Sequence, residues 1–327
     1  MRRTFVLFLS LACIAVFATG AVAGPHATGE VQTLRQYNPD AGELPEGIAI
    51  DKRGRIYITM APIGELRRID TDGSEHVVAQ LPVGTGNGPL GLAVDAPGNV
   101  YVGVHTNDPT TQGVYRVAPS GAVARLPGSE QIGFANGVAF GDGGTLYVTD
   151  TIRGAVWRIP KGGSAELWVE GPLFAGNGSA PPPFPIGANG ITYRQGTVFV
   201  TNTEQASIVS IPVNDDGSAG EPSILIQDPA LGAADGIAAD VHGDLYVPVI
   251  GQSTLVRVAG DGSDIEVLAD GTDGLDYASS VAFGTGRGLR STLFIVNFSI
   301  GPFFGDVRTH GPALLSLEVG VPGLPQP

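Results

Sequence analysis

The segment LPEGIAID at residues 44–51 recurs five more times along the chain at nearly even spacing. The six copies are LPEGIAID (44–51), GPLGLAVD (88–95), FANGVAFG (134–141), GANGITYR (187–194), AADGIAAD (233–240) and YASSVAFG (277–284). Their equivalent central residues, glycine in the first five copies and Ser280 in the last, are separated by 44, 46, 53, 46 and 44 positions. A period of about 40–50 residues built from short strands is typical of propeller blades. The sequence therefore predicts an all-β fold, a six-bladed β-propeller with four antiparallel strands per blade.

The ends of the chain predict how the ring closes. Each copy is followed by a second and a third strand rich in β-branched and aromatic residues, and five units continue into a fourth. The sixth unit stops after its third strand, ALLSLE (313–318), whereas VQTLRQY (31–37) precedes the first unit. We expect 31–37 to complete the last blade, because this pairing removes open strand edges. The alternative, a linear solenoid of six repeats, leaves that strand without a role.

The first 23 residues resemble a signal peptide. Arg2 and Arg3 precede an apolar run over 5–17, and Ala21-Val22-Ala23 provides the small residues that signal peptidase requires. The run is shorter than the roughly 20 residues that a membrane span needs. We therefore expect no membrane span, a propeller domain over 24–327, and a secreted or periplasmic protein. Arg2-Arg3 also resembles a twin-arginine signal and residues 10–13 resemble a lipoprotein box, so the export route stays open.

Composition excludes two classes of function. Loss of the leader leaves 16 basic against 32 acidic residues, a net charge of −16, so nucleic acid is not an expected partner. The acidic balance fits either solubility or attraction of cations. Cys13, the only cysteine, lies in the leader, so a mature chain has neither a disulfide nor thiol chemistry. The chain is long enough to bury its own core, and we expect a monomer.

Oxygen-bearing side chains recur at one position of the repeat, just before its central residue. We call these six positions the ring residues: Glu46, Leu90, Asn136, Asn189, Asp235 and Ser279. Equivalent positions in a propeller face its axis, so we expect Glu46, Asn136, Asn189 and Asp235 to converge at the top of the channel, the face where the first strands begin. Carboxylate and amide oxygens favour Ca²⁺ or Mg²⁺ over zinc or copper. The alternative is that Asn and Asp before Gly are only turn formers, which does not account for Glu46.

At this point the mature chain resembles the regucalcin/gluconolactonase family, which is related to diisopropyl-fluorophosphatase and the paraoxonases. Glu46 matches the glutamate of that family's first blade, and Asn136 and Asn189 match its asparagines. Asp235 matches the aspartate that serves as metal ligand and catalytic group. The resemblance implies a six-bladed propeller with a catalytic calcium or another divalent ion.

The sequence also departs from the family. Sugar-lactone members carry an arginine near the third-blade ligand, and the corresponding Phe134–Gly137 segment has none. No histidine stands beside Ser279, where related enzymes use one. His105 and His310 are expected on the top face as candidate substrate-binding residues, with a structural role as the alternative. Residues 171–186 form a proline-rich insertion, expected either as a semi-rigid rim over the channel or as a loop without a ligand role.

These features favour a divalent-metal-dependent hydrolase of a lactone or related ester. Asp235 is the expected base or nucleophile, and Asn136 and Asn189 are expected to fix the substrate oxygen. The main alternative is a non-catalytic propeller that binds a protein or small ligand on its top face, because fold alone does not decide function. A lyase resembling strictosidine synthase is a more remote alternative on the same scaffold.

Overall fold

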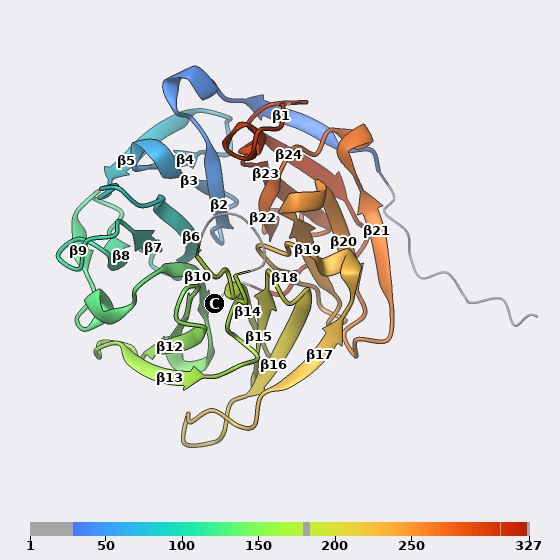
Figure 1. The fold of residues 1–327 in the computed structure, drawn as a ribbon. Coiled ribbons are helices and arrows are strands. Elements are labelled where there is room, and N and C mark those ends of the chain that lie inside the picture. Colours follow the sequence, from blue (N-terminus) through green and yellow to red (C-terminus); the bar gives the residue numbers. More distant parts are fainter. Residues whose placement is uncertain (1–28, 179–183, 308, 326–327) are drawn as a thin grey trace, which may run out of the picture.

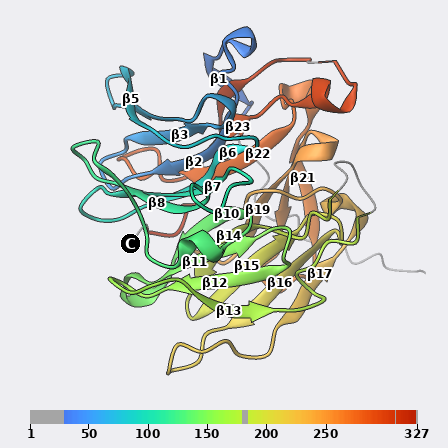
Figure 2. The ribbon, with the colours of Figure 1, turned by 60° about the vertical axis from the view of Figure 1, so that its left-hand side comes forward.

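Six four-stranded antiparallel sheets surround a central channel, as the sequence predicted (Figure 1). The computed structural model describes residues 29–178, 184–307 and 309–325. The first strand of each blade lies nearest the axis and the last lies at the rim (Figures 1 and 2). The leader and its cleavage site lie outside the described residues.

The strands follow the repeat closely. Blade 1 contains β2 (Pro45–Ile50), β3 (Ile56–Met60), β4 (Glu65–Ile69) and β5 (Glu75–Gln80). Blade 2 contains β6 (Gly88–Val94), β7 (Val100–His105), β8 (Gly113–Val117) and β9 (Val123–Arg125). Blade 3 contains β10 (Ala135–Phe140), β11 (Leu146–Asp150), β12 (Ala155–Ile159) and β13 (Glu166–Glu170). Blade 4 contains β14 (Ala188–Arg194), β15 (Thr197–Asn202), β16 (Ser207–Pro212) and β17 (Ser223–Gln227). Blade 5 contains β18 (Ala238–Ala239), β19 (Leu245–Val249), β20 (Thr254–Val258) and β21 (Ile265–Ala269).

Blade 6 joins the two ends of the chain. It contains β22 (Ala278–Phe283), β23 (Thr292–Asn297) and β24 (Ala313–Glu318), and its outer strand is β1 (Gln32–Gln36). β1 pairs antiparallel with β24, with Gln32 opposite Ser316 and Gln36 opposite Ala313. The Arg35 guanidinium also reaches blade 1, where it lies 3.0 Å from Glu75. The expected closure by the strand at 31–37 is therefore confirmed.

The helical segments that the structure describes are short 3₁₀ turns in the connections. They are η1 (Pro39–Ala41), η2 (Ala61–Ile63), η3 (Ser129–Gln131), η4 (Asp142–Gly144), η5 (Pro229–Leu231), η6 (Ile250–Gln252), η7 (Gly271–Asp273) and η8 (Gly301–Phe304). Within the described residues, no helix has the length and apolar character needed to cross a membrane.

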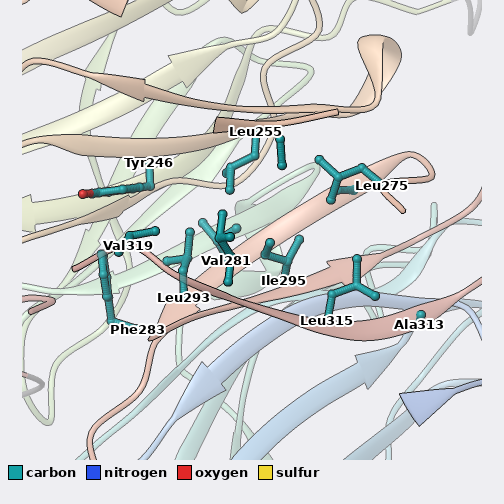
Figure 3. Close-up of a cluster of buried hydrophobic side chains, with 13 residues drawn as sticks. Tyr246, Leu255, Leu275, Val281, Phe283, Leu293, Ile295, Ala313, Leu315 and Val319 are labelled. Carbon is teal, nitrogen blue, oxygen red and sulfur yellow. The ribbon is translucent and has the colours of Figure 1, made fainter. Parts of the chain in front are cut away.

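The hydrophobic core is divided among the six interfaces between blades. At the junction of blades 5 and 6, Tyr246 and Leu255 of one sheet pack against Val281, Leu293 and Ile295 of the next (Figure 3). Comparable clusters fill the other junctions. Because burial is spread around the ring, each first strand is held from both sides, and this fixes the position of its ring residue.

The repeated glycine allows the first strands to approach one another near the axis. A Cβ atom added to Gly47 would lie 2.4 Å from the Leu90 carbonyl oxygen, and one on Gly137 would lie 2.6 Å from the Asn189 carbonyl oxygen. In both cases the carbonyl belongs to the ring residue of the next blade. Glycine recurs at this position in five of the six repeats because an added side chain would collide with the backbone of the next blade; the sixth repeat has Ser280.

Candidate functional site

A β-bulge lies at the ring residue of five of the six blades. The pairing of β2 with β3 gains one extra residue between Pro45 and Ile48, and Glu46 lies in this interval. The same irregularity brackets the ring residues of blades 2, 3, 4 and 6. Bulges bend a strand and redirect a side chain, and they are frequent beside active sites. The alternation of a regular strand therefore does not set the direction of these side chains.

The structure brings together the four predicted oxygen donors. Glu46, Asn136, Asn189 and Asp235 line one cavity of about 370 Å³, and Ser279 contributes to the same wall. All four donors are buried. The cavity follows the channel from the ring residues toward the underside, where Arg194 and Leu324 are among its lining residues.

Glu46 and Asp235 form a pair of buried carboxyl groups. Burial raises the pKa of Asp235 to about 7, and a hydrogen bond from the Asn189 side chain opposes this shift. Burial also raises the pKa of Glu46 well above its usual range, and the negative charge of Asp235 adds to that effect. The described residues contribute no basic side chain to either shift. Like charges without a counter-charge are costly in a buried site.

One carboxylate oxygen at the ring has no hydrogen-bond partner among the described residues. Glu46 Oε2 is fully buried and accepts no hydrogen bond from the described residues. Buried polar atoms are nearly always paired in native proteins, so an unpaired one needs an explanation such as an ion or water. A hydrogen-bond donor, a water molecule or a cation in the cavity would supply the missing partner.

The two ring asparagines are held in one hydrogen-bonded chain. Asn136 Nδ2 donates to Asn189 Oδ1 at 2.7 Å and to Thr151 Oγ1 at 3.2 Å. Asn189 Nδ2 donates to Thr203 Oγ1 at 2.9 Å. Both amide nitrogens are thus engaged within the protein, and that of Asn189 also donates to Asp235.

The donor set suits a hard cation in composition. Two carboxylates and two amides supply oxygen ligands of the kind that Ca²⁺ and Mg²⁺ prefer. No group of three or more His, Cys, Asp and Glu side chains that could hold a metal ion occurs in the described part of the chain. A metal centre at the ring would therefore need amide, backbone or water oxygens besides the two carboxylates.

An apolar cluster covers the top side of the ring. Leu90, the ring residue of blade 2, packs with Ala61 and Phe134, and Phe184 and Phe298 lie against them. Phe184 comes from the end of the proline-rich insertion, and its ring centroid lies 6.3 Å from that of Phe134. The insertion therefore contributes at least this residue to the rim of the channel.

The two candidate histidines occupy different environments, and neither lines the cavity. The His105 ring is buried, stacks on Phe134 at a centroid distance of 3.9 Å, and pairs through Nε2 with Asn107 Oδ1 at 2.8 Å. Burial lowers the pKa of His105. His310 is exposed, and its Nε2 lies 2.8 Å from the Gly271 carbonyl oxygen. The structure thus places His105 beside the apolar cluster and does not bring His310 to the ring.

Polar residues at the ends of the second strands hold the top loops. Asp150 accepts hydrogen bonds from the backbone of Gly133 and Phe134. In the same way, Asn202 donates to the carbonyls of Leu173 and Ala175. These side chains organise the connections between blades and are not ligands of the ring.

The sequence reasoning missed the threonines at the top of blades 3 and 4. The signal was present, because Thr149-Asp150-Thr151 and Thr201-Asn202-Thr203 repeat at equivalent positions. The Thr149 hydroxyl accepts from Gly137 N and donates to the Asn189 carbonyl of the next blade. Thr201 makes the equivalent bonds to Gly190 and Asp235. These hydroxyls tie neighbouring ring positions together.

Comparison with known proteins agrees with this architecture. The model of the family described as SMP-30/Gluconolactonase/LRE-like region matches residues 91–177, which span blades 2 and 3 and include Asn136. No curated protein matches the sequence. The chain is thus a six-bladed propeller with a carboxylate- and amide-bearing site at one end of its channel. The resemblance to the regucalcin/gluconolactonase-like family that its sequence indicated is confirmed.

Solved structures show the same fold at low sequence identity. A calcium-binding regucalcin from Agrobacterium tumefaciens is 16% identical, with a TM-score of 0.67 over 92% of this chain and 97% of that one. A gluconolactonase from Xanthomonas campestris is 17% identical, with a TM-score of 0.62 over 90% and 98%. Virginiamycin B lyase from Staphylococcus aureus is also 17% identical, with a TM-score of 0.57 over 83% of each chain. Likeness at this level establishes the fold alone.

Proposed function

We propose that the chain is a divalent-metal-dependent hydrolase of a lactone or a related ester, using Ca²⁺ or Mg²⁺. The observation that carries the proposal is the pair of buried carboxyl groups, Glu46 and Asp235, in one cavity wall with two asparagines and no basic side chain contributing to their pKa shifts. A cation is the simplest partner for such a pair. The family resemblance supports a lactonase-type activity.

Four residues would hold the ion: Glu46 and Asp235 through carboxylate oxygens, and Asn136 and Asn189 through amide oxygens. A bound divalent ion supplies Lewis-acid polarisation of the substrate carbonyl and stabilises negative charge on its oxygen. Such an ion would give the unpaired Oε2 of Glu46 a partner. The oxygen donors of the ring thus fit the divalent cation that the family resemblance implies.

Asp235 is the proposed base. Its carboxylate accepts a proton from water while the water oxygen bonds to the carbonyl carbon of the lactone. The ring C–O bond then breaks, and the departing alkoxide takes the proton back from Asp235. The pKa of about 7 belongs to the metal-free site; a bound divalent cation would lower it and keep the carboxylate ionised as a base. Asn189 holds the carboxylate by the hydrogen bond that opposes the rise in its pKa.

A substrate screen tests the activity. Purified protein is assayed against aliphatic, aromatic and sugar lactones, aryl esters and phosphotriesters, before and after removal of metal by a chelator. We expect turnover of at least one lactone or ester, loss of turnover on chelation, and recovery with Ca²⁺ or Mg²⁺. Calcium binding without turnover of any substrate would favour the non-catalytic alternative, and turnover that resists chelation would contradict the metal requirement.

We also propose that the protein is exported through its leader. The motif Ala21-Val22-Ala23 predicts cleavage after Ala23. The mass of the protein recovered from the exported fraction is expected to correspond to residues 24–327. A lipid-bearing chain that starts at Cys13 would contradict this site.

A further inference from the structure

Two threonine hydroxyls next to the ring each face an asparagine amide and a backbone carbonyl. Thr151 Oγ1 lies 3.2 Å from Asn136 Nδ2 and 2.8 Å from the Ala188 carbonyl oxygen. Thr203 Oγ1 lies 2.9 Å from Asn189 Nδ2 and 2.8 Å from the Ala234 carbonyl oxygen. Ala188 and Ala234 immediately precede the ring residues of the next blades, so both hydroxyls bridge two blades.

The direction of these hydrogen bonds follows from chemistry. A carbonyl oxygen only accepts, so each threonine must donate its single hydroxyl proton to the alanine carbonyl. The hydroxyl oxygen then has only lone pairs left for the asparagine. Only the NH₂ end of an amide donates to a lone pair, and therefore the NH₂ ends of Asn136 and Asn189 must face Thr151 and Thr203.

The opposite end of each amide is thereby fixed as well. With Nδ2 turned to the threonine, Oδ1 lies on the other side of the planar amide group. For Asn189, Oδ1 accepts one hydrogen bond from Asn136 at 2.7 Å and keeps a second lone pair. A flipped asparagine would present an NH₂ group, which repels a cation, in place of an oxygen.

We propose that Thr151 and Thr203 are positioning residues that orient the amide oxygens of Asn136 and Asn189 for a divalent cation. The inference rests on the proposed metal site and explains how the amide groups of its two neutral ligands are oriented. Neither threonine lines the cavity, and both act through the asparagines. Partners of this kind typically change metal affinity by about 10- to 100-fold when they are removed.

Blade 2 provides a matched control. His105 occupies the position equivalent to Thr151, and the next residue, Thr106, is a buried threonine in a blade whose ring residue is Leu90. Its hydroxyl bonds within its own loop, to Thr111 Oγ1 at 2.8 Å and to the Asp108 carbonyl at 3.2 Å. Thr106→Val therefore removes a buried hydroxyl one residue beyond that position without freeing a ring amide.

The test is calcium binding by metal-free full-length protein, measured by calorimetry, with thermal melting in chelator as a check on folding. Thr203→Val is expected to weaken calcium binding about 10- to 100-fold, whereas Thr203→Ser and Thr106→Val retain near wild-type affinity. In an Asn189→Asp background, Thr203→Val should no longer weaken binding, because both ends of a carboxylate are oxygen and reorientation has no cost.

Each outcome separates this inference from the proposed function. If the wild type binds calcium and Thr203→Val binds it as tightly, or loses no more affinity than Thr106→Val, the positioning role is wrong while the metal site stands. An equal loss of calcium affinity from Thr203→Val in the wild-type and Asn189→Asp backgrounds would also overturn the positioning role. Such a loss would not depend on the orientation of the Asn189 amide. Failure of the wild type to bind any divalent cation would overturn the metal site and this inference together.

Discussion

A Cβ atom built on Gly190 would lie 2.3 Å from the carbonyl oxygen of Asp235 in the next blade. We therefore expect Gly190→Ala to force the first strands of blades 4 and 5 apart and to cost about 1–3 kcal/mol or more, as overpacking does in tight cores. Gly271→Ala is the control, because its added methyl group meets no atom within 4 Å. Denaturant unfolding of both variants measures the difference. Equal stability would show that the blades can separate freely at the ring.

The buried carboxyl pair predicts an unusual pH response in the metal-free protein. Because the pKa of Asp235 is raised to about 7 and that of Glu46 is also raised, the folded state retains protons that the unfolded chain releases from about pH 4 upward. The contribution of these groups to stability is therefore greatest in acid and falls as pH rises toward 7.

Thermal melting in chelator between pH 4 and 8 measures this response. The reference is a double variant, Glu46→Gln with Asp235→Asn, in which the pair does not titrate. Relative to it, the wild type is expected to lose stability as the pH rises and to regain it when calcium is added at pH 8. Parallel curves for the two proteins, with no effect of calcium on either, would exclude the proposed coupling.

Much of the fold could be predicted because each structural blade corresponds to one repeat of the sequence. The spacing of Gly47 and its equivalents reflects a steric need at five of the six blade junctions, and the unpaired third strand at 313–318 indicated where 31–37 must pair. The four ring donors could be predicted because equivalent positions in a propeller face the same axis.

Other features of the site depend on contacts that no repeat encodes. The bulge beside Glu46 is visible only in the strand register, and the unpaired Oε2 of Glu46 only in the packed structure. The position of His310 follows from a loop held to Asp276, which accepts from the backbone of His310 and Gly311. That loop occurs in one blade, so alignment of the repeats could not place it.

Closure by β1 predicts the effect of an amino-terminal deletion. Removing residues 24–37 leaves β24 unpaired along its outer edge and removes the contact between Arg35 and Glu75. Exposed strand edges promote association, so we expect aggregation or a marked fall in melting temperature. A deletion of residues 24–28 alone is the control, because it leaves β1 intact. Light scattering and thermal melting of the two truncated proteins measure the effect, and equal behaviour would argue against closure as a source of stability.

The proposed roles of the two carboxylates predict different kinetic defects. Glu46→Gln keeps an oxygen donor but removes charge, so we expect weaker ion binding as the main effect. Excess calcium should then restore much of the activity, because Glu46 has no proposed proton role. Turnover measured against calcium concentration, with whichever substrate the screen identifies, gives the apparent calcium affinity. A defect that saturating calcium leaves unchanged would assign Glu46 a part in the chemistry itself.

Asp235→Asn should behave differently, because it removes both a charge and the proposed proton acceptor. If Asp235 were only a turn residue before Gly236, asparagine would replace it with little effect, since Asn is equally common there. If it is the base, turnover should fall by about 10²–10⁴-fold at saturating calcium while the melting profile stays cooperative. The measurement is kcat at saturating calcium for wild type, Asp235→Asn and Glu46→Gln in parallel. Wild-type turnover in Asp235→Asn under these conditions would rule out the mechanism and leave Asp235 as a ligand or a turn residue.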